Sequence, residues 1–393
     1  MGAALLGNGD GALGAPMVSV TIGGRVHVVY RGIDARIHYR LWNGKHWKPD
    51  VTLNSPAAKN HQPHIAAAPQ GGVDVVFVGE SAGSASYVVY YCARHGKNWS
   101  APLRLSNESY AQLPRLALAP DGVIHVVYNR FGEAFQEIYY TRFDGSVWSA
   151  PQVIGSGFYP DIALNADGQA VVAWNNKSKV FYAQRSADGS WSAPQRVRAG
   201  SMPQTPSLVF DAAGTGHLVA QGRADDAQTL MYAQCPRGGG FARATRVPVG
   251  ALTFTMYPRL AMDCNGQLRL VYQGKALAKE SWRVFQSIWD GALWSKPTRL
   301  DAPAMDTINQ VPDISANGNV VAVTWWARNG PAMEIYAEAQ TIECDAPVSM
   351  SRALDKPAKP KRKSAPPKPK AKPKPKTTAR KPRRKMGANK KKG

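Results

Sequence analysis

The sequence predicts an all-β fold built from one repeated unit of four short strands. The clearest copy runs from Leu113 to Pro151. A β-rich run that begins with a proline is followed by an Asp-Gly turn, a second β-rich run, a polar loop and a third run, and then by a second Asp-Gly turn and Trp-Ser-Ala-Pro. The anchor prolines recur at intervals of 47, 51, 46, 46, 52 and 54 residues, at Pro16, Pro63, Pro114, Pro160, Pro206, Pro258 and Pro312. Seven such repeats, none able to bury both faces alone, are typical of radially arranged sheets. Residues 1–345 are therefore predicted to form a seven-bladed β-propeller.

Each predicted strand follows from a local signal in the repeat. The first strand is expected to begin directly after the anchor proline, which has no N–H to donate to a strand ladder. A turn with glycine at a position of positive φ, such as Asp121-Gly122, is expected to end it. The second and third strands are rich in β-branched and aromatic residues, which suit a packed, pleated surface. One large aromatic residue per repeat is expected to wedge between neighbouring sheets, at Trp47, Trp99, Trp148, Trp191, Phe241 and Trp294.

The turn before each of these aromatic residues resembles a known motif. The nearest copy reads Ser186-Ala187-Asp188-Gly189-Ser190-Trp191, followed by Ser-Ala-Pro. This ending is similar to a degenerate Asp-box, the turn found in sialidase-type propellers with bacterial neuraminidase repeats. The resemblance covers roughly residues 15–340. In that family the box is structural and lies away from the ligand, so the resemblance implies fold more than function.

The last repeat lacks the Trp-Ser-Pro ending, while the first fifteen residues belong to no repeat. Since a ring must close to leave no sheet edge exposed, part of Ala3–Leu6 or a segment close to it is predicted to supply a strand to the last sheet. The segment TIECDAPV, which begins at Thr341, is the competing candidate.

The residue after each anchor proline is predicted to lie at the mouth of the central channel. These residues are Met17, His64, Arg115, Asp161, Ser207, Arg259 and Asp313. Two interpretations stay open: the charged residues pair around the ring and seal it, or they form a ligand-recognition site rimmed by Tyr159 and Tyr257. Variable loops with acidic residues would surround such a site, at Asp34, Glu80, Glu133, Asp225, Asp226 and Glu280.

The resemblance to sialidases also implies catalytic groups: an arginine triad that holds a carboxylate, a Tyr-Glu pair and an acidic Asp. No motif places them here, and the Arg-Ile-Pro signature of that family is absent from residues 15–25. Arg115, Arg259, Tyr257 and Glu280 supply a partial set at most, and retaining glycosidases need paired groups held close together. The sequence therefore assigns no catalytic residue.

Cysteine and histidine spacing predicts neither a disulfide framework nor a metal site. The four cysteines lie far apart and form no CxxC pair, at Cys92, Cys235, Cys264 and Cys344. The first two are expected to be buried thiols. His27, His125 and His217 share one register in alternate repeats. A whole sheet would lie between any two of them, so they could not bind one ion. No metal or other cofactor is expected.

Residues 346–393 are predicted to be a disordered, Lys/Pro-rich basic tail. Residues 353–393 hold 18 Lys or Arg and one acid, a net charge of +17, whereas the other 352 residues carry +5. Almost no large apolar side chain is present to offset the entropy of ordering. The composition resembles the tails of linker histones and of histone-like bacterial proteins, which implies binding to nucleic acid or another polyanion. The cations are Lys356, Lys359, Lys361, Arg362, Lys363, Lys368, Lys370, Lys372, Lys374, Lys376, Arg380, Lys381, Arg383, Arg384, Lys385, Lys390, Lys391 and Lys392.

Other roles for the tail stay open: a solubilising or localisation appendage, or docking on an acidic protein or membrane surface. The leading hypothesis is a non-catalytic propeller that recognises a protein or glycan and is tethered by its tail to nucleic acid or another polyanion. A sialidase-like lectin or glycoside hydrolase is the second, and a structural component of a nucleoprotein or virus particle the third. Without a recognisable signal peptide or membrane-spanning run, the chain is predicted to be cytoplasmic or nucleoid-associated, or nuclear in a eukaryotic host.

Overall fold

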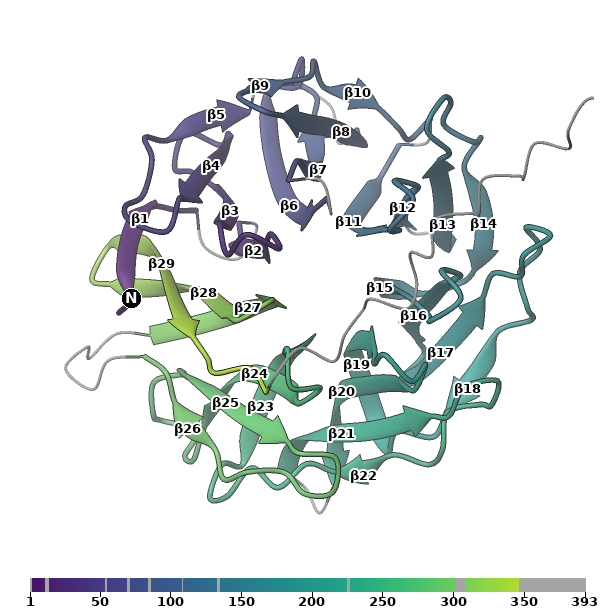
Figure 1. Ribbon diagram of the computed structural model, residues 1–393, viewed down its shortest axis with the longest axis vertical. Helices are drawn as coiled ribbons and strands as arrows, with labels where there is room; N and C mark the ends of the chain where they lie inside the picture. The colour runs from purple at the N-terminus through teal and green to yellow at the C-terminus, as the bar shows by residue number, and fades with distance from the viewer. Residues whose placement is uncertain are drawn as a thin grey trace, which may run out of the picture. The chain divides into compact units, whose positions relative to one another are not determined.

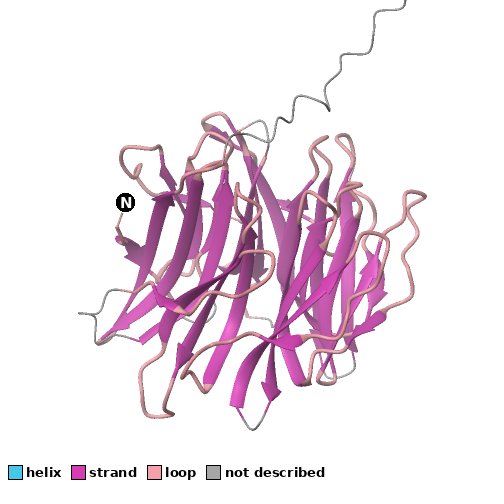
Figure 2. Cartoon of the chain, turned by 60° about the horizontal axis from the view of Figure 1, so that its bottom comes forward, coloured by secondary structure: helices cyan, strands magenta, loops and turns pink. Residues whose placement is uncertain are grey.

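The structure is a computed structural model that describes residues 2–10, 14–53, 55–68, 71–83, 86–107, 109–132, 135–224, 227–301 and 308–345. The chain divides into two units, Met1–Ala346 and Pro347–Gly393, and every described strand belongs to the first. The described residues form strands and loops but no helix, and hence no helix able to cross a membrane (Figure 2). Figure 1 shows the sheets of the first unit arranged in a ring.

Hydrogen bonding joins the described strands into six antiparallel or mostly antiparallel sheets. The first sheet holds β2(Met17–Val20), β3(Val26–Arg31), β4(Ile37–Trp42) and β5(Val51–Leu53). The second holds β6(Lys59–Ala67), β7(Val73–Glu80), β8(Tyr87–His95), β9(Asn98–Trp99) and β10(Leu103–Arg104). The third holds β11(Ala111–Leu118), β12(Ile124–Gly132), β13(Phe135–Phe143) and β14(Gln152–Gly155). The fourth holds β15(Phe158–Leu164), β16(Ala170–Asn176), β17(Lys179–Gln184) and β18(Gln195–Val197).

The fifth sheet is larger because repeats five and six share it. It holds β19(Ser201–Phe210), β20(Gly216–Ala224), β21(Ala227–Cys235), β22(Thr245–Arg246), β23(Phe254–Met262), β24(Leu268–Lys275), β25(Arg283–Trp289) and β26(Thr298–Arg299). One parallel pair, Gln228 with Phe254, joins β21 to β23, while the pairing within each half is antiparallel. Each half therefore repeats the four-strand order of the other sheets.

The sixth sheet joins the two ends of the ring. It holds β27(Ile308–Asn317), β28(Val320–Asn329) and β29(Ala332–Thr341), and β1(Ala4–Asn8) adds to its edge with Ala4 opposite Ala337. The prediction that the N-terminal residues complete the last sheet is thus confirmed. The competing segment is not the closing strand: its Thr341 ends β29.

Six of the seven anchor prolines lie inside the innermost strands. Pro16 is the exception and stands directly before β2. The expectation that every first strand begins after its proline was therefore wrong. Each of the other six prolines follows a residue of positive φ where the strand register shifts, namely Gln62, Leu113, Tyr159, Thr205, Tyr257 and Val311. Such a bulge leaves proline's missing N–H outside the ladder, which is why a strand tolerates it there.

The predicted aromatic wedges are confirmed. Trp99 lies edge-on to Tyr39 of the preceding sheet, with ring centroids 4.9 Å apart, and Trp191 meets Tyr140 at the same distance. The turn motif supports the wedge Trp148: Asp144 Oδ1 accepts the backbone N–H groups of Ser146 and Val147 at 2.9 and 3.0 Å. These turn bonds lower the pKa of the Asp144 carboxyl. The Asp-box-like sequence is therefore a structural device here.

The cysteines correct one prediction and confirm another. Cys264, in the turn between β23 and β24, forms a disulfide with Cys344, which follows β29. Asn265 secures the same segment, since its Nδ2 donates to Glu343 O at 2.9 Å and its Oδ1 accepts Asp345 N–H at 2.8 Å. Cys92 and Cys235 are buried free thiols, as predicted. Spacing gave no sign of the disulfide because 80 residues separate its partners.

Candidate functional site

Six of the seven predicted mouth residues meet around one cavity of about 180 Å³ between the innermost strands. They are His64, Arg115, Asp161, Ser207, Arg259 and Asp313. Met17 is not among the residues that line this central cavity; Val18 and Ser19 represent its strand instead. The repeat thus places one post-proline side chain from each of six strands at a common point.

Four of these side chains also tie consecutive innermost strands together. Each accepts the N–H of the residue two positions after the proline in the next repeat. The pairs are His64 Nδ1 with Leu116 N (3.3 Å), Asp161 Oδ2 with Leu208 N (2.8 Å), Ser207 Oγ with Leu260 N (3.1 Å) and Asp313 Oδ2 with Val18 N (2.9 Å). Part of the polarity at the mouth therefore serves the ring itself, in line with the sealing interpretation.

The two arginines are less completely engaged. Arg115 Nε lies 4.0 Å from Asp161 Oδ1, and Arg259 Nε lies 3.8 Å from Asp313 Oδ1, both beyond hydrogen-bond length. Arg115 Nη1 donates to Pro114 O at 3.2 Å, whereas the guanidinium of Arg259 donates no hydrogen bond to the described residues. Guanidinium donors thus remain available within the cavity.

Burial sets the protonation of these groups. Desolvation, reinforced by Arg259, lowers the pKa of Arg115 to about 10, while Asp161 and Asp313 oppose that shift. Desolvation raises the pKa of Asp313, against the attraction of Arg259. The pKa of His64 is held well below its usual value by burial and then by the two arginines, so the imidazole is neutral and its Nδ1 can accept. Two cations and two carboxylates leave the cavity close to neutral.

The predicted rim residues do not line this cavity. Tyr159 is 43% exposed and Tyr257 is half-buried, and both hold the positive-φ position before their prolines. Asp34 binds His38 Nε2, and Glu80 lies 3.6 Å from Lys59 Nζ. Glu280 Oε2 accepts two backbone N–H groups of its own loop, those of residues 276 and 277. Glu133, Asp225, Asp226 and the eighteen tail cations lie outside the described residues.

The three histidines in one register each make a local contact. Nδ1 of His27, His125 and His217 lies 2.8 Å from the hydroxyl of Tyr39, Tyr140 and Tyr232, respectively. Each tyrosine in turn packs against an aromatic wedge of the next repeat. Within the described ranges, no three His, Cys, Asp or Glu side chains are grouped as metal ligands would be.

Sequence reasoning missed the amide side chains that support the bulges. Gln62 Oε1 accepts Leu113 N–H at 2.8 Å, and Gln273 Oε1 accepts Val311 N–H at 2.9 Å. Both donors are positive-φ residues directly before an anchor proline. A glutamine in the first or second strand of a repeat was the available signal, but only the bulge geometry shows that it accepts the N–H before the next anchor proline.

No protein-family model and no curated protein sequence matches the chain. Solved structures do resemble it. A protein of unknown function from Dyadobacter fermentans is 12% identical, with a TM-score of 0.55 over 87% of this chain and 100% of that one. The polysaccharide lyase Uly1 is 10% identical, with a TM-score of 0.54 over 86% and 91%. The Aleuria aurantia lectin AAL, in complex with Fucα1-6GlcNAc, is 12% identical, with a TM-score of 0.51 over 74% and 97%. These likenesses show the fold class, an all-β, propeller-like ring of sheets.

Proposed function

We propose that residues 1–345 form a seven-bladed propeller that binds a sugar group in the central cavity. Seven blades follow if the eight-stranded sheet is counted as two, since its halves meet at the single pair of Gln228 and Phe254. The observation that carries the binding proposal is the convergence of six polar post-proline side chains on one cavity.

The chemistry of this cavity suits a neutral, polyhydroxylated ligand. Each sugar hydroxyl both donates and accepts a hydrogen bond, and the cavity offers both kinds of partner: N–H groups of Arg115 and Arg259, and the Oδ1 atoms of Asp161 and Asp313. A lone anion would meet two carboxylates as well as two guanidinium groups. Hydrogen bonds to charged groups are the stronger ones, so hydroxyls would gain from either side.

Size limits what can enter. The cavity of about 180 Å³ is smaller than the roughly 300–1,000 Å³ of pockets for drug-sized ligands. It would therefore take one sugar unit or part of one, while the remainder of a longer glycan stays outside. The solved structures that share this fold include a lectin in complex with a fucosylated sugar and a polysaccharide lyase, which agrees with a carbohydrate ligand.

Binding suits these residues better than hydrolysis does. In Asp161 and Asp313, one oxygen accepts a backbone N–H and the other faces an arginine. A glycosidase needs a carboxylate free to attack and a second that delivers a proton. Carboxylates held on both sides are better suited to orienting hydroxyls.

A glycan array followed by calorimetry on the full chain tests the proposal. Arg259→Ala is expected to weaken binding of the best glycan at least tenfold. Arg243→Ala, which removes an exposed arginine outside the cavity, is the matched control and should bind as the parent does. If no glycan binds, or if Arg259→Ala binds normally, the mouth residues only seal the ring.

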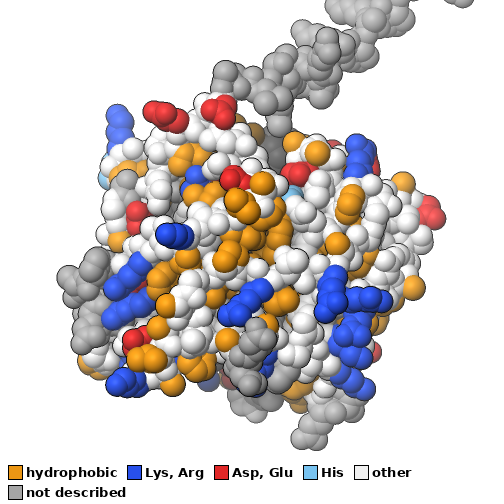
Figure 3. Space-filling model, turned by 90° about the horizontal axis from the view of Figure 1, so that it is seen from below, with side chains coloured by type: hydrophobic (Ala, Val, Ile, Leu, Met, Phe, Trp, Pro, Cys, Tyr) orange, Lys and Arg blue, Asp and Glu red, His pale blue; other side chains and the backbone are white. Residues whose placement is uncertain are grey.

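The basic tail carries a separate proposal, that it binds nucleic acid or another polyanion. Its support is compositional: 18 cations and one acid within residues 353–393. Basic side chains also lie on the outer side of the ring (Figure 3), so a chain ending at Arg352 is the necessary comparison. If about ten phosphates are contacted, affinity for DNA should fall roughly a thousandfold or more between 50 and 200 mM salt. Equal binding by the shortened chain would contradict the proposal.

A further inference from the structure

Repeat five differs from its neighbours at the turn that carries the aromatic wedge. In three other repeats two aromatic side chains face each other across this turn, in the pairs Trp42 with Trp47, Phe143 with Trp148 and Trp289 with Trp294. The corresponding residues of repeat five are Cys235 and Phe241, because Ala242 N–H donates to Gln234 O as Ser295 N–H donates to Ile288 O. Both side chains are smaller than their counterparts.

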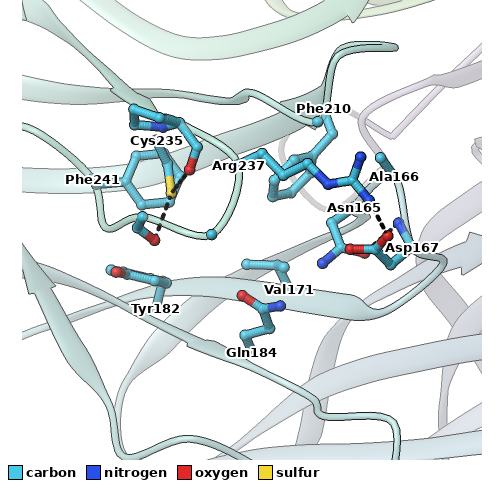
Figure 4. A pocket seen from close by; sticks show the side chains of 14 residues that line it. Asn165, Ala166, Asp167, Val171, Tyr182, Gln184, Phe210, Cys235, Arg237 and Phe241 are labelled. Atoms are coloured by element: carbon cyan, nitrogen blue, oxygen red, sulfur yellow. Dashed lines mark hydrogen bonds and ion pairs between the residues drawn. The ribbon is translucent and has the colours of Figure 1, made fainter.

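A cavity of about 190 Å³ lies where these larger side chains are missing. Its apolar lining includes Val171 and Tyr182 from the fourth sheet and Phe210 and Phe241 from the next repeat (Figure 4). Phe241 still packs edge-on against Tyr182, with centroids 4.9 Å apart, so the interface between sheets is kept. The exposed ion pair of Arg237 and Asp167 joins two turns and lines the polar side of the cavity.

Several polar groups around the cavity have partners within the protein. Cys235 Sγ donates to Gly239 O at 3.2 Å, and the Tyr182 hydroxyl donates to Gln195 Oε1 at 2.6 Å. Gln184 Nε2 donates to Gln169 Oε1 at 2.8 Å, but Gln184 Oε1 accepts no hydrogen bond from the described residues. Gln184 Oε1 is thus an acceptor without a donor among the described residues, on a side chain that lines the same cavity as the aromatic residues.

We propose that this cavity binds a small aromatic molecule with one hydrogen-bond donor, of the phenol or indole class. An apolar cavity of about 150 Å³ in another protein is known to stay dry and bind benzene, so the volume is sufficient. The ring of the ligand would pack against Phe210, Phe241 and Tyr182, where aromatic pairs are favourable. Its O–H or N–H would donate to Gln184 Oε1, an acceptor that benzene cannot use.

The test titrates the full chain with indole, phenol and benzene, followed by calorimetry and ligand-detected NMR. Saturable binding of indole or phenol at one site per chain is expected, with benzene weaker. Phe241→Trp restores the side chain present at this register in other repeats and should weaken binding at least tenfold. Leu293→Trp is the matched control, because it adds an indole to an exposed turn residue of repeat six and leaves the cavity open.

Cys235→Leu adds volume to the cavity lining beside Phe241 and replaces Phe241→Trp as the test if that variant folds poorly. Gln184→Leu should reduce the preference for phenol over benzene. Absence of saturable binding in the parent chain would overturn the proposal, as would unchanged binding in both Phe241→Trp and Cys235→Leu. Equal affinities for phenol and benzene would overturn the role of Gln184.

Discussion

Asp313, in the last innermost strand, accepts the backbone N–H of Val18, in the first, at 2.9 Å across 295 positions of sequence. This bond closes the inner edge of the ring, and β1 closes the outer edge through its pairing with β29. The same carboxylate faces Arg259 in the central cavity. Ring closure and the proposed binding site therefore depend on one side chain.

Asp313→Ala should lower the free energy of unfolding by about 2–3 kcal/mol, because it leaves the Val18 N–H without an acceptor and the partly buried Arg259 guanidinium without its nearest carboxylate. Asp313→Asn keeps an acceptor for that N–H and should recover about 1 kcal/mol of the loss. Urea denaturation of the three chains measures the difference. Equal stability of the two variants would show that the bond to Val18 contributes nothing.

Trp148→Ala should lower the free energy of unfolding by about 3 kcal/mol, since it removes the wedge that meets Tyr91 with centroids 5.0 Å apart. Leu293→Ala, at an exposed position in the corresponding turn of repeat six, is the control and should change it by less than about 0.5 kcal/mol. Chemical denaturation gives both values. Similar effects of the two substitutions would contradict the wedge role.

Stability should fall as pH rises through the range in which His38 loses its proton. Hydrogen bonds to Asp50 and Asp34 raise the pKa of His38 from 6.5 to about 9. A raised pKa means that the folded state binds the proton more tightly, so this stabilisation is complete below pH 6.5 and disappears by about pH 9. Thermal unfolding between these values measures the slope. His38→Gln should reduce the fall in stability between these pH values. An unchanged pH dependence in this variant would show that other groups cause the fall.

Reduction of the Cys264–Cys344 disulfide should lower the free energy of unfolding by about 4.5 kcal/mol, the loop-closure value for a separation of 80 residues. Denaturation with and without dithiothreitol measures it. Cys264→Ser should lose this sensitivity, whereas Cys92→Ser, which removes a buried free thiol, should keep it. Disulfides are typical of oxidising compartments, so this bond weighs against the predicted cytoplasmic location.

Periodicity explains what the sequence could predict. Trp148, Trp191 and Trp294 recur at one register, and so do Arg115 and Asp161 after their prolines, so a single repeat model placed the wedges and the cavity lining together. The unpaired start of the chain likewise predicted the closing strand.

Features that depend on contacts between repeats could not be predicted in this way. Neither Leu113 nor Tyr159 belongs to a residue type that favours positive φ, so the bulges before the prolines left no local signal. The pairing of Cys264 with Cys344 and the space beside Phe241 depend on which turns become neighbours in the ring. The approach of Arg259 to Asp313 in the central cavity also depends on which repeats become neighbours.

The position of β1 has a consequence for biosynthesis. Ala4 leaves the ribosome long before Ala337, its partner in the completed sheet. At 5–20 residues per second this delay is roughly 20–70 s, during which the nascent chain has an N-terminal strand without a partner and a set of sheets not yet closed. Chaperones that shield exposed strand edges would act within this interval. A ribosome that stalls before residue 332 would release a chain that lacks β29 and therefore cannot close the ring.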